Sequence, residues 1–595
     1  MLMEPPKPKA KVKEILENKN TRYGLLALLP VVVLCVIGVR LFFVQIIDHD
    51  KYVAEASSQR VKQTELIAKR GEIYMMSGED GVTPVVMNER TWTIFIDPSY
   101  VADKDKVQSE VSNILGDQMI TDWSKVWSNM KNMYVEVAKN VNYDTVSKIK
   151  AANLRGVGQK ETSKRVYPAG ELASQVLGFV NAEGVGTGVE GSLNDKLSGT
   201  NGLLKSVTDV NDIPLSIGDD NIEIAAKDGE DVVLTLDENI QHKVERILQS
   251  AMANNSGISA ASALVMDPNT GKIYAMANYP TYNPEQYWKV TDSSVYTNRT
   301  TESPYEPASV CKTFTYATAL NENAISLSDT YVNTGKTVVA DRTIHNATSS
   351  NPHTGTLTFQ SALDFSLNTG SVEVLRRMGG GDITKATRTK LYDYLHNDFG
   401  LGQKTGVELY EESGTIISPE ETEGNAVRYA NMTFGQGMNL TMVQVASGFS
   451  SIINGGKYYQ PTIVAGTMQD GKLVKAEQKA ALRQTISAST SATMRKALRE
   501  VRSVNGGKYD PAGYYVGVKT GTAETYDENG NYTSDKTVAS VIGFGGTGKD
   551  DAMPQYVVMV RLDGNRLLWG SINAVPIFTE ISNYMIEYLR VAPNI

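Results

Sequence analysis

Cysteine is almost absent from this chain, with only two residues, Cys35 and Cys311, among 595. Cys35 lies in an apolar run and Cys311 lies far downstream, so we expect no disulfide between them. Cysteine content therefore neither requires nor excludes an oxidising compartment. Positive charge is not in excess either, with 58 Lys and Arg against 67 Asp and Glu. A nucleic-acid-binding protein would carry a basic face, so we expect no nucleic acid among the partners.

Patterns that would hold a metal or a nucleotide are also missing. His345 and His353 have no third ligand at a useful spacing, so we expect no metal. Residues 543–549 nearly spell a phosphate-binding loop, but Asp550 follows where a Ser or Thr would bind the metal. We interpret that segment as a turn between two strands, and we expect no cofactor.

One long apolar run is present, because residues 23–47 carry a single charge, Arg40. Such a run is long enough to cross a hydrocarbon core of about 30 Å. A cleaved signal peptide would have a shorter apolar core followed by small residues, and this run has neither. Lys and Arg outnumber Asp and Glu in residues 1–22, which favours a cytoplasmic amino terminus. We predict a cytoplasmic tail over 1–22, a transmembrane helix over 23–47, and a single-pass protein of the cell membrane whose remaining residues are extracytoplasmic.

A chain of this length should divide into more than one domain. Residues 49–69 are polar and helix-compatible, and are predicted to continue the membrane helix. Alternation at 91–96 predicts a strand, and amphipathic patterns predict helices at 104–115 and 144–152. We interpret residues 48–225 as one extracytoplasmic domain of mixed strands and helices, which we call the pedestal.

A second domain is predicted over residues 230–595. Strands at both of its ends, with helices between them, indicate one sheet covered by helices, an α/β (α+β) fold. The expected strands are 231–236, 263–268, 272–277, 516–519, 538–542 and 556–560, and the expected flanking helices are 238–253 and 574–589.

Three short strings occur in a fixed order in this second domain. They are Ser309-Val310-Cys311-Lys312, Ser366-Leu367-Asn368 and Lys519-Thr520-Gly521. Their order is more informative than any one string, because Ser-x-x-Lys also occurs at 128–131 and 147–150. A second Lys-Thr-Gly, at 404–406, follows a glycine-rich loop, and we interpret it as structural.

Ser309 and Lys312 have the spacing of a nucleophile and its base. Residues i and i+3 share a helix face, and Pro307 suits a first helical turn. A serine nucleophile needs a base within hydrogen-bond reach. Lysine can be that base only where burial and nearby positive charge lower its pKa, and we expect Lys519 to be the second charge. The Ser309 N–H at the helix start is a candidate oxyanion donor.

The middle string offers one hydroxyl and one amide. The Ser366 hydroxyl could pass a proton between Lys312 and a leaving amine, and Asn368 can both donate to and accept from a peptide amide. Ser-x-Asn on its own would be read as a solvated helix end, so this interpretation depends on the neighbouring strings.

The last string is predicted at the end of a strand, where it can bind substrate. Lys519 and the Thr520 hydroxyl can hold a terminal carboxylate, and Gly521 lets a substrate backbone approach closely. The Thr522 N–H is the second candidate oxyanion donor. The sequence thus predicts catalytic residues Ser309, Lys312 and Ser366, and substrate-binding residues Asn368, Lys519, Thr520, Gly521 and Thr522.

With these strings the chain resembles a class B penicillin-binding protein, a monofunctional D,D-transpeptidase that cross-links peptidoglycan. Further strings that resemble the family are Lys69-Arg70-Gly71-Glu72-Ile73-Tyr74, Arg165-Val166-Tyr167-Pro168, Gly188-Val189-Glu190, Tyr305-Glu306-Pro307-Ala308, Gly435-Gln436-Gly437 and Asn454-Gly455-Gly456. The resemblance implies a serine transpeptidase fold of the penicillin-recognising type, preceded by a dimerisation-like pedestal and one transmembrane helix. It implies that Ser309 attacks the penultimate D-alanine carbonyl of a stem peptide, and that β-lactams mimic this acyl donor.

The chain departs from the family pattern in places. Met75 and Met76 follow Tyr74 where Asp-Arg is usual, which weakens the assignment of that loop only. Ala308 replaces a common glycine, and Leu367 replaces the Asp of Ser-Asp-Asn.

The resemblance also implies partners. No glycosyltransferase region is visible, so a membrane glycosyltransferase of the shape, elongation, division and sporulation family would supply glycan strands, alongside division or elongation proteins. The absence of a large insertion favours septal over lateral wall synthesis. Two alternatives stay open. One is a β-lactamase or β-lactam sensor, which shares the three strings but normally lacks this pedestal or carries more membrane helices. The other is a non-catalytic scaffold of the wall-synthesis machinery.

Overall fold

The computed structural model describes residues 19–49, 51–52, 61–181, 183–207, 222–347, 353–526, 532–547 and 552–593. The chain forms two compact units, one of Met1–Lys69 with Gly199–Asp228 and one of Arg70–Ser198 with Gly229–Ile595. The two units are described separately.

The first unit contains the apolar helix that the sequence predicts. Helix α2 (Lys19–Phe42) continues into the short π-helix η1 (Phe43–Ile47). Within it, Leu28–Ile47 has the length and composition to cross a membrane. This finding is compatible with a single-pass membrane anchor.

The prediction that this helix continues through residues 49–69 is wrong at its far end. Strand β1 (Val61–Leu66) lies there and pairs antiparallel with β6 (Gly202–Val207), which in turn pairs with β7 (Ile222–Ile224). Six residues of β1 are in register with β6, and this long-range pairing outweighs a weak local helix preference. Residues 53–60 lie outside the described residues.

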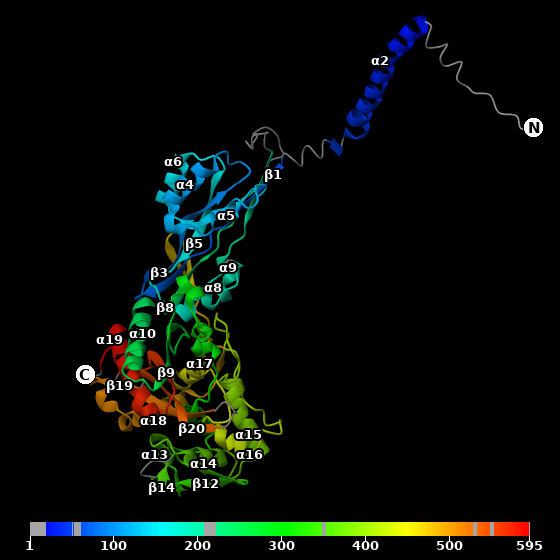
Figure 1. Cartoon of the computed structure of the whole chain (residues 1–595). Helices are drawn as coiled ribbons and strands as arrows, with labels where there is room; N and C mark the ends of the chain where they lie inside the picture. Colours follow the sequence, from blue (N-terminus) through cyan, green and yellow to red (C-terminus); the bar gives the residue numbers. More distant parts are fainter. Residues whose placement is uncertain are drawn as a thin grey trace, which may run out of the picture. The chain divides into compact units, whose positions relative to one another are not determined.

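In the second unit, residues 81–166 form a small layered structure with its own core. Figure 1 shows α4 and α6 side by side, and α6 contacts β3. Both predicted helices are confirmed, and each begins after a side chain that accepts a hydrogen bond from its first turn, Asp103 for α4 and Asn142 for α6. The elements are β3 (Gly81–Ile96), α4 (Lys104–Leu115), α5 (Trp123–Val126), β4 (Val135–Val141), α6 (Tyr143–Ala152) and β5 (Val157–Val166).

Strand β8 (Asp231–Asp237) is present where predicted but belongs to a different sheet from the one expected. It pairs parallel with β2 (Ile73–Ser77) and antiparallel with β16 (Val464–Gln469). The whole sheet has the order β17-β16-β8-β2-β3-β4, with β5 also on β3 and with β17 at Lys472–Lys475. Six of the seven β8 residues are buried. The sequence of a strand that is buried on both faces does not show which strands it pairs with.

A buried ion-pair cluster joins three distant segments of this second unit. Glu190, in α8 (Gly188–Ser192), is completely buried. Its carboxylate accepts hydrogen bonds from Arg70 Nε at 2.7 Å and from Arg165 Nε at 2.6 Å. Asn88 of β3 bonds to both arginines, through the Arg70 carbonyl and the Arg165 guanidinium. This cluster fixes the segment 188–192 against β3 and β5.

The predicted α/β layering is confirmed in the remainder of the second unit. Five antiparallel strands lie in the order β10-β9-β21-β20-β19. They are β9 (Ile258–Met266), β10 (Ile273–Tyr279), β19 (Tyr514–Tyr526), β20 (Tyr532–Thr547) and β21 (Tyr556–Gly564). The hairpin predicted at 263–277 is β9–β10.

Helices cover both faces of this sheet. On one face lie α10 (Glu238–Ala253) and α19 (Val575–Tyr588), where the Tyr556 hydroxyl bonds to Ser582. On the other face, Phe449 of α17 packs near Phe544 of β20. The remaining helices of this part are α11 (Arg299–Glu302), α12 (Lys312–Asn321), α13 (Phe359–Asp364), α14 (Asn368–Met378), α15 (Lys385–Tyr392), α16 (Ala426–Met432), α17 (Met442–Ile453) and α18 (Ala488–Val504).

Two small hairpin-like pairs lie beside α14. Strand β11 (Thr330–Asn333) pairs with β14 (Gly355–Thr358), and β12 (Lys336–Val339) pairs with β13 (Arg342–His345).

The near-match to a phosphate loop is explained by packing, and the expected turn is wrong for most of the segment. Residues 543–547 belong to β20. A side chain at Gly543 would lie 2.6 Å from the Phe578 ring, and one at Gly545 would lie 2.0 Å from the Tyr556 hydroxyl. These glycines make room for aromatic rings of α19 and β21.

Candidate active site

The nucleophile string forms a turn that leads directly into a buried helix. Residues Ala308–Cys311 make a 3-10 turn, η5, and α12 begins at Lys312. Pro307 precedes the turn as its N-cap, so the helical region starts one residue later than predicted. Ser309 is half-buried, whereas Lys312 is completely buried. The turn therefore presents the serine while the lysine points into the protein.

The turn is held by an unusual backbone conformation. Ala308 has a φ of 50°, in the left-handed region, and its N–H donates to the Gly435 carbonyl at 3.2 Å. A Cβ atom at Gly435 would lie 2.1 Å from the Ala308 carbonyl oxygen. Strain of this kind is kept only where the surroundings over-determine it, here through the Gly435 segment.

Lys312 donates hydrogen bonds to the middle string, Ser366-Leu367-Asn368. Its Nζ donates to the Ser366 carbonyl, to Ser366 Oγ at 3.1 Å and to Asn368 Oδ1 at 2.9 Å. Ser366 has a φ of 56°, also left-handed. Among the described residues, no hydrogen bond joins Ser309 to Lys312; in free enzymes such bonds are often long and shorten only with substrate.

Lys519 approaches the same hydroxyl from the opposite side. Its Nζ donates to Ser366 Oγ at 2.8 Å and to the Thr520 carbonyl at 3.3 Å. The string lies in the middle of β19, which continues to Tyr526, so the predicted position at a strand end is wrong. The reason is that β19 and β20 stay paired beyond the site. One hydroxyl oxygen thus lies between two buried lysines.

The two lysines are electrostatically unusual. Burial, followed by the charge of Lys519, holds the pKa of Lys312 well below its usual range. Burial also lowers the pKa of Lys519 to about 7, an effect that the Asp364 carboxylate partly opposes. A desolvated amine beside another cation is the environment in which a lysine can act as a base near neutral pH.

The β19 residues after Lys519 have distinct environments. A side chain at Gly521 would lie 2.5 Å from Ser540 Oγ and 2.7 Å from the Pro307 carbonyl oxygen, so glycine lets the nucleophile turn pack on the strand. Sequence reasoning missed this role. Thr520 and Thr522 are half-buried, and Thr522 Oγ1 accepts from the Gly570 N–H at 3.1 Å.

The duplicate strings lie elsewhere. Those at 128–131 and 147–150 belong to the region of α5 and α6, in a separate core. At 404–406, Thr405 Oγ1 and the Gly406 N–H bond to the Glu411 carboxylate, which confirms the structural interpretation of that loop.

Comparison with known proteins agrees with this fold and geometry. Residues 261–583 match the family model of the penicillin binding protein transpeptidase domain, and residues 65–234 match that of the penicillin-binding protein dimerisation domain. The fold and site define a serine acyltransferase of the penicillin-recognising type. The chain belongs to the penicillin-binding protein transpeptidases.

Relatives cover nearly the whole chain. Stage V sporulation protein D of Bacillus subtilis is 32% identical over 97% of this chain and 87% of its own length. Peptidoglycan D,D-transpeptidase FtsI of Escherichia coli is 26% identical over 93% of this chain and 90% of its own. Among solved structures, penicillin binding protein 2X of Streptococcus thermophilus superposes with a TM-score of 0.69 at 24% identity, covering 89% and 80% of the two chains.

Proposed function

We propose that this protein is a membrane-anchored peptidoglycan D,D-transpeptidase that works through an acyl-enzyme on Ser309. The observation that carries the proposal is the pair of buried lysines, Lys312 and Lys519, on either side of Ser366 Oγ and next to the Ser309 turn. The family match, and the name of the FtsI relative, support peptidoglycan stem peptides as substrate and β-lactams as inhibitors.

In the acylation step, neutral Lys312 takes the proton from Ser309 Oγ as that oxygen bonds to the penultimate D-alanine carbonyl carbon. The N–H groups of Ser309 and Thr522 stabilise the negative oxygen that forms. The C–N bond then breaks, and the leaving amine receives the proton from Lys312 through the Ser366 hydroxyl. Terminal D-alanine departs, and the amine of a neighbouring stem later attacks the acyl group.

The remaining residues bind and orient the substrate. Asn368 has an amide that faces Lys312 and can also contact the stem-peptide backbone. Charged Lys519 and the Thr520 hydroxyl hold the terminal carboxylate. Gly521 keeps β19 close to the nucleophile turn.

The apolar helix supports an arrangement in the membrane. We assign residues 1–22 to the cytoplasm, 23–47 to the membrane, 48–225 to the pedestal and 230–595 to the transpeptidase domain. The charge bias of the tail supports this topology, and the family matches at 65–234 and 261–583 support the two domains. A membrane glycosyltransferase and division or elongation proteins are the partners we propose, with septal rather than lateral wall synthesis as the favoured role. Co-purification from detergent without such a glycosyltransferase would count against this part.

The first test is mass spectrometry of the full-length chain in detergent after exposure to benzylpenicillin. We expect one persistent adduct per chain, on the peptide that contains Ser309, and no adduct with Ser309→Ala. Rapid loss of the adduct with penicillin turnover would favour a β-lactamase. No adduct on the wild type would favour a scaffold, and an adduct on Ser309→Ala would show that the nucleophile is another residue.

The rate of acylation is expected to have a pH optimum set by the two lysines. At low pH Lys312 becomes protonated and cannot accept the serine proton, so the rate falls. Because the pKa of Lys519 is lowered to about 7, this residue loses its charge above that pH and holds a carboxylate less well. We therefore expect acylation by benzylpenicillin to decline above about pH 7, measured as the second-order rate constant between pH 5 and 9.

The methyl ester of benzylpenicillin is the matched control for this profile. It has no carboxylate, so its slower acylation should keep the fall at low pH and lose the decline at high pH. A benzylpenicillin profile that stays flat from pH 6 to 9 would contradict the role given to Lys519.

A further inference from the structure

The side-chain amide of Asn368 is held in one orientation by contacts at both ends. Its Oδ1 accepts from Lys312 Nζ at 2.9 Å, and its Nδ2 donates to the His345 carbonyl at 3.0 Å. The reversed amide would place its oxygen against the His345 carbonyl oxygen, and neither of these two groups can donate. The position of the His345 carbonyl therefore decides which way Asn368 faces.

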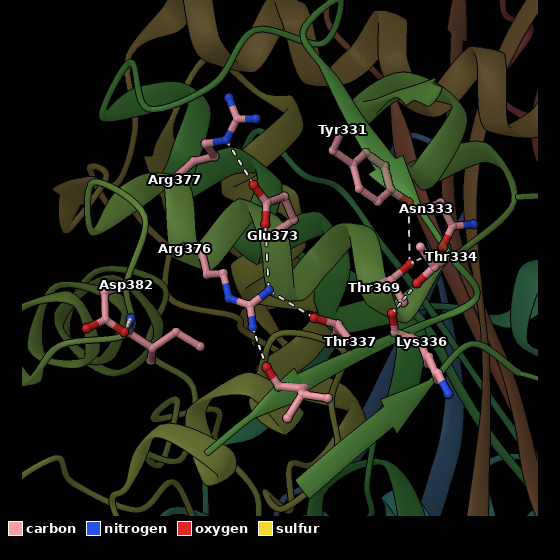
Figure 2. A network of polar contacts seen from close by, with 12 residues as sticks. Tyr331, Asn333, Thr334, Lys336, Thr337, Thr369, Glu373, Arg376, Arg377 and Asp382 are labelled. Atoms are coloured by element: carbon pink, nitrogen blue, oxygen red, sulfur yellow. Dashed lines mark hydrogen bonds and ion pairs between the residues drawn. The ribbon is translucent and has the colours of Figure 1, made fainter. Parts of the chain in front are cut away.

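His345 ends the β12–β13 pair, which has only two strands and mostly exposed residues. A pair of this size is marginal without support from elsewhere. Figure 2 shows that α14 supplies part of that support, because Arg376 Nη1 donates to Thr337 Oγ1 of β12 at 2.9 Å. Glu373 lies 3.8 Å from the same guanidinium. This contact holds the second residue of β12, whose register partner Ile344 directly precedes His345.

Asn346, the residue after His345, holds the end next to the site. Its Oδ1 accepts from both the N–H and the hydroxyl of Thr369, each at 3.0 Å. Its Nδ2 donates to Asn333 Oδ1 at 3.2 Å, and its own N–H donates to the Gly335 carbonyl at 3.1 Å. Thr369 directly follows Asn368, and Figure 2 shows it close to Asn333 and Tyr331. Asn346 thus joins the hairpin to the residue next to Asn368.

These bonds also complete the start of α14. A helix leaves the N–H groups of its first turn without internal partners. Leu367 occupies the N-cap of α14 and provides no side-chain acceptor. Asn346 accepts from the Thr369 N–H in its place, from a different segment of the chain. Thr369 is 4% exposed and Asn333 1% exposed, so this junction is almost closed to water.

We propose that Asn346 is a positioning residue for acylation: it fixes the His345 carbonyl relative to the first turn of α14, and so keeps Asn368 Oδ1 against Lys312. The inference deepens the proposed function and rests on the roles given there to Lys312 and Asn368.

Replacing Asn346 should shift the pH profile of acylation, and a simple loss of stability would not. When Asn368 turns away, the Lys312 ammonium loses an acceptor, which destabilises its charged form and lowers the pKa of Lys312 further. The charged group that faces Lys312 is Lys519 of β19, and the groups contributed by Ser366 and Asn368 are neutral. The fall in acylation rate at low pH should therefore move to lower pH, while the maximum rate drops.

The test compares acylation of the full-length chain by benzylpenicillin, with its pH profile, in the wild type, Asn346→Ala and Asn425→Ala. Asn425 caps α16, where its Oδ1 accepts from the Arg428 N–H at 3.0 Å, and is the matched loss of a helix cap. We expect Asn346→Ala to be acylated about 10- to 100-fold more slowly, because small misplacements of reacting groups slow reactions by factors of this order. Its fall in rate at low pH should move to lower pH. Asn425→Ala should lower Tm similarly and leave the rate and profile unchanged.

A second variant keeps the test decisive if Asn346→Ala folds poorly. Asn346→Asp still offers oxygens to Thr369 and places a negative charge where a helix start favours it, so acylation should return to within about threefold of the wild type. Wild-type rates in Asn346→Ala, equal effects of Asn346→Ala and Asn425→Ala, or no rescue by aspartate would each overturn the inference. A wild type without any Ser309 adduct would reject the proposed function itself, and this inference with it.

Discussion

Replacing Lys312 with methionine is expected to slow acylation by benzylpenicillin at least about a thousandfold. Methionine has a similar length and tolerates the complete burial of this position, but it cannot take a proton from Ser309. It also leaves Ser366 Oγ with a single lysine, Lys519. The residual slow reaction should lose the fall in rate at low pH, because the group that titrates there is gone. The measurement is the second-order acylation rate constant by mass spectrometry.

The duplicate Ser-x-x-Lys strings provide the control. Lys150, at the end of the string 147–150, is exposed on α6, so Lys150→Met makes the same substitution far from the three strings. It should acylate at the wild-type rate. A Lys312→Met enzyme that acylates normally, with a Tm like that of the wild type, would mean that another group accepts the proton.

Replacing Glu190 with alanine is expected to lower the free energy of unfolding of the second unit by about 3–5 kcal/mol. The carboxylate is completely buried between Arg70 and Arg165, and removing it leaves two guanidinium groups without their charge partner. Removing one partner of a buried ion pair destabilises a protein by more than the intact pair stabilises it, because the remaining charge is still shielded from water. The exposed pair Arg90–Glu161 is the matched contrast, and Glu161→Ala should leave the urea midpoint almost unchanged, because exposed ion pairs contribute little.

The readout follows from where the tryptophans lie. Trp92, Trp123 and Trp127 belong to the core of β3, α4 and α6 or pack against it. Their fluorescence in urea should therefore report the transition that Glu190→Ala weakens. A midpoint that moves no further for Glu190→Ala than for Glu161→Ala would show that the buried cluster contributes little.

How much of the site can be predicted from the sequence depends on how far apart in sequence the contacting residues lie. The fixed order of the three strings predicts that Ser309, Lys312, Ser366 and Lys519 lie in one site, because each string has side chains of recognisable chemistry. Helix α4 was predicted with its observed bounds, since capping and periodicity are local signals.

Other features depend on partners that are distant in sequence. The sheet to which β8 belongs is set by β2 and β16, and a strand that is buried on both faces gives no sign of this choice. Asn346 has no motif around it and acquires its role only because the chain returns to α14. A side chain at position 521 would also meet the Pro307 carbonyl, more than 200 residues earlier, and no local pattern shows this contact.

Because β8 pairs in parallel with β2, the transpeptidase part cannot be separated from β2 without exposing one edge of its own strand. Its chain could be cut before Asp231 without touching any of the three strings. The cut would nevertheless leave β8 with β16 on one side and a bare row of N–H and C=O groups on the other. Such an open edge invites pairing with other chains and aggregation. Fusing the transpeptidase part to a different pedestal, in evolution or in the laboratory, would therefore require another strand in place of β2.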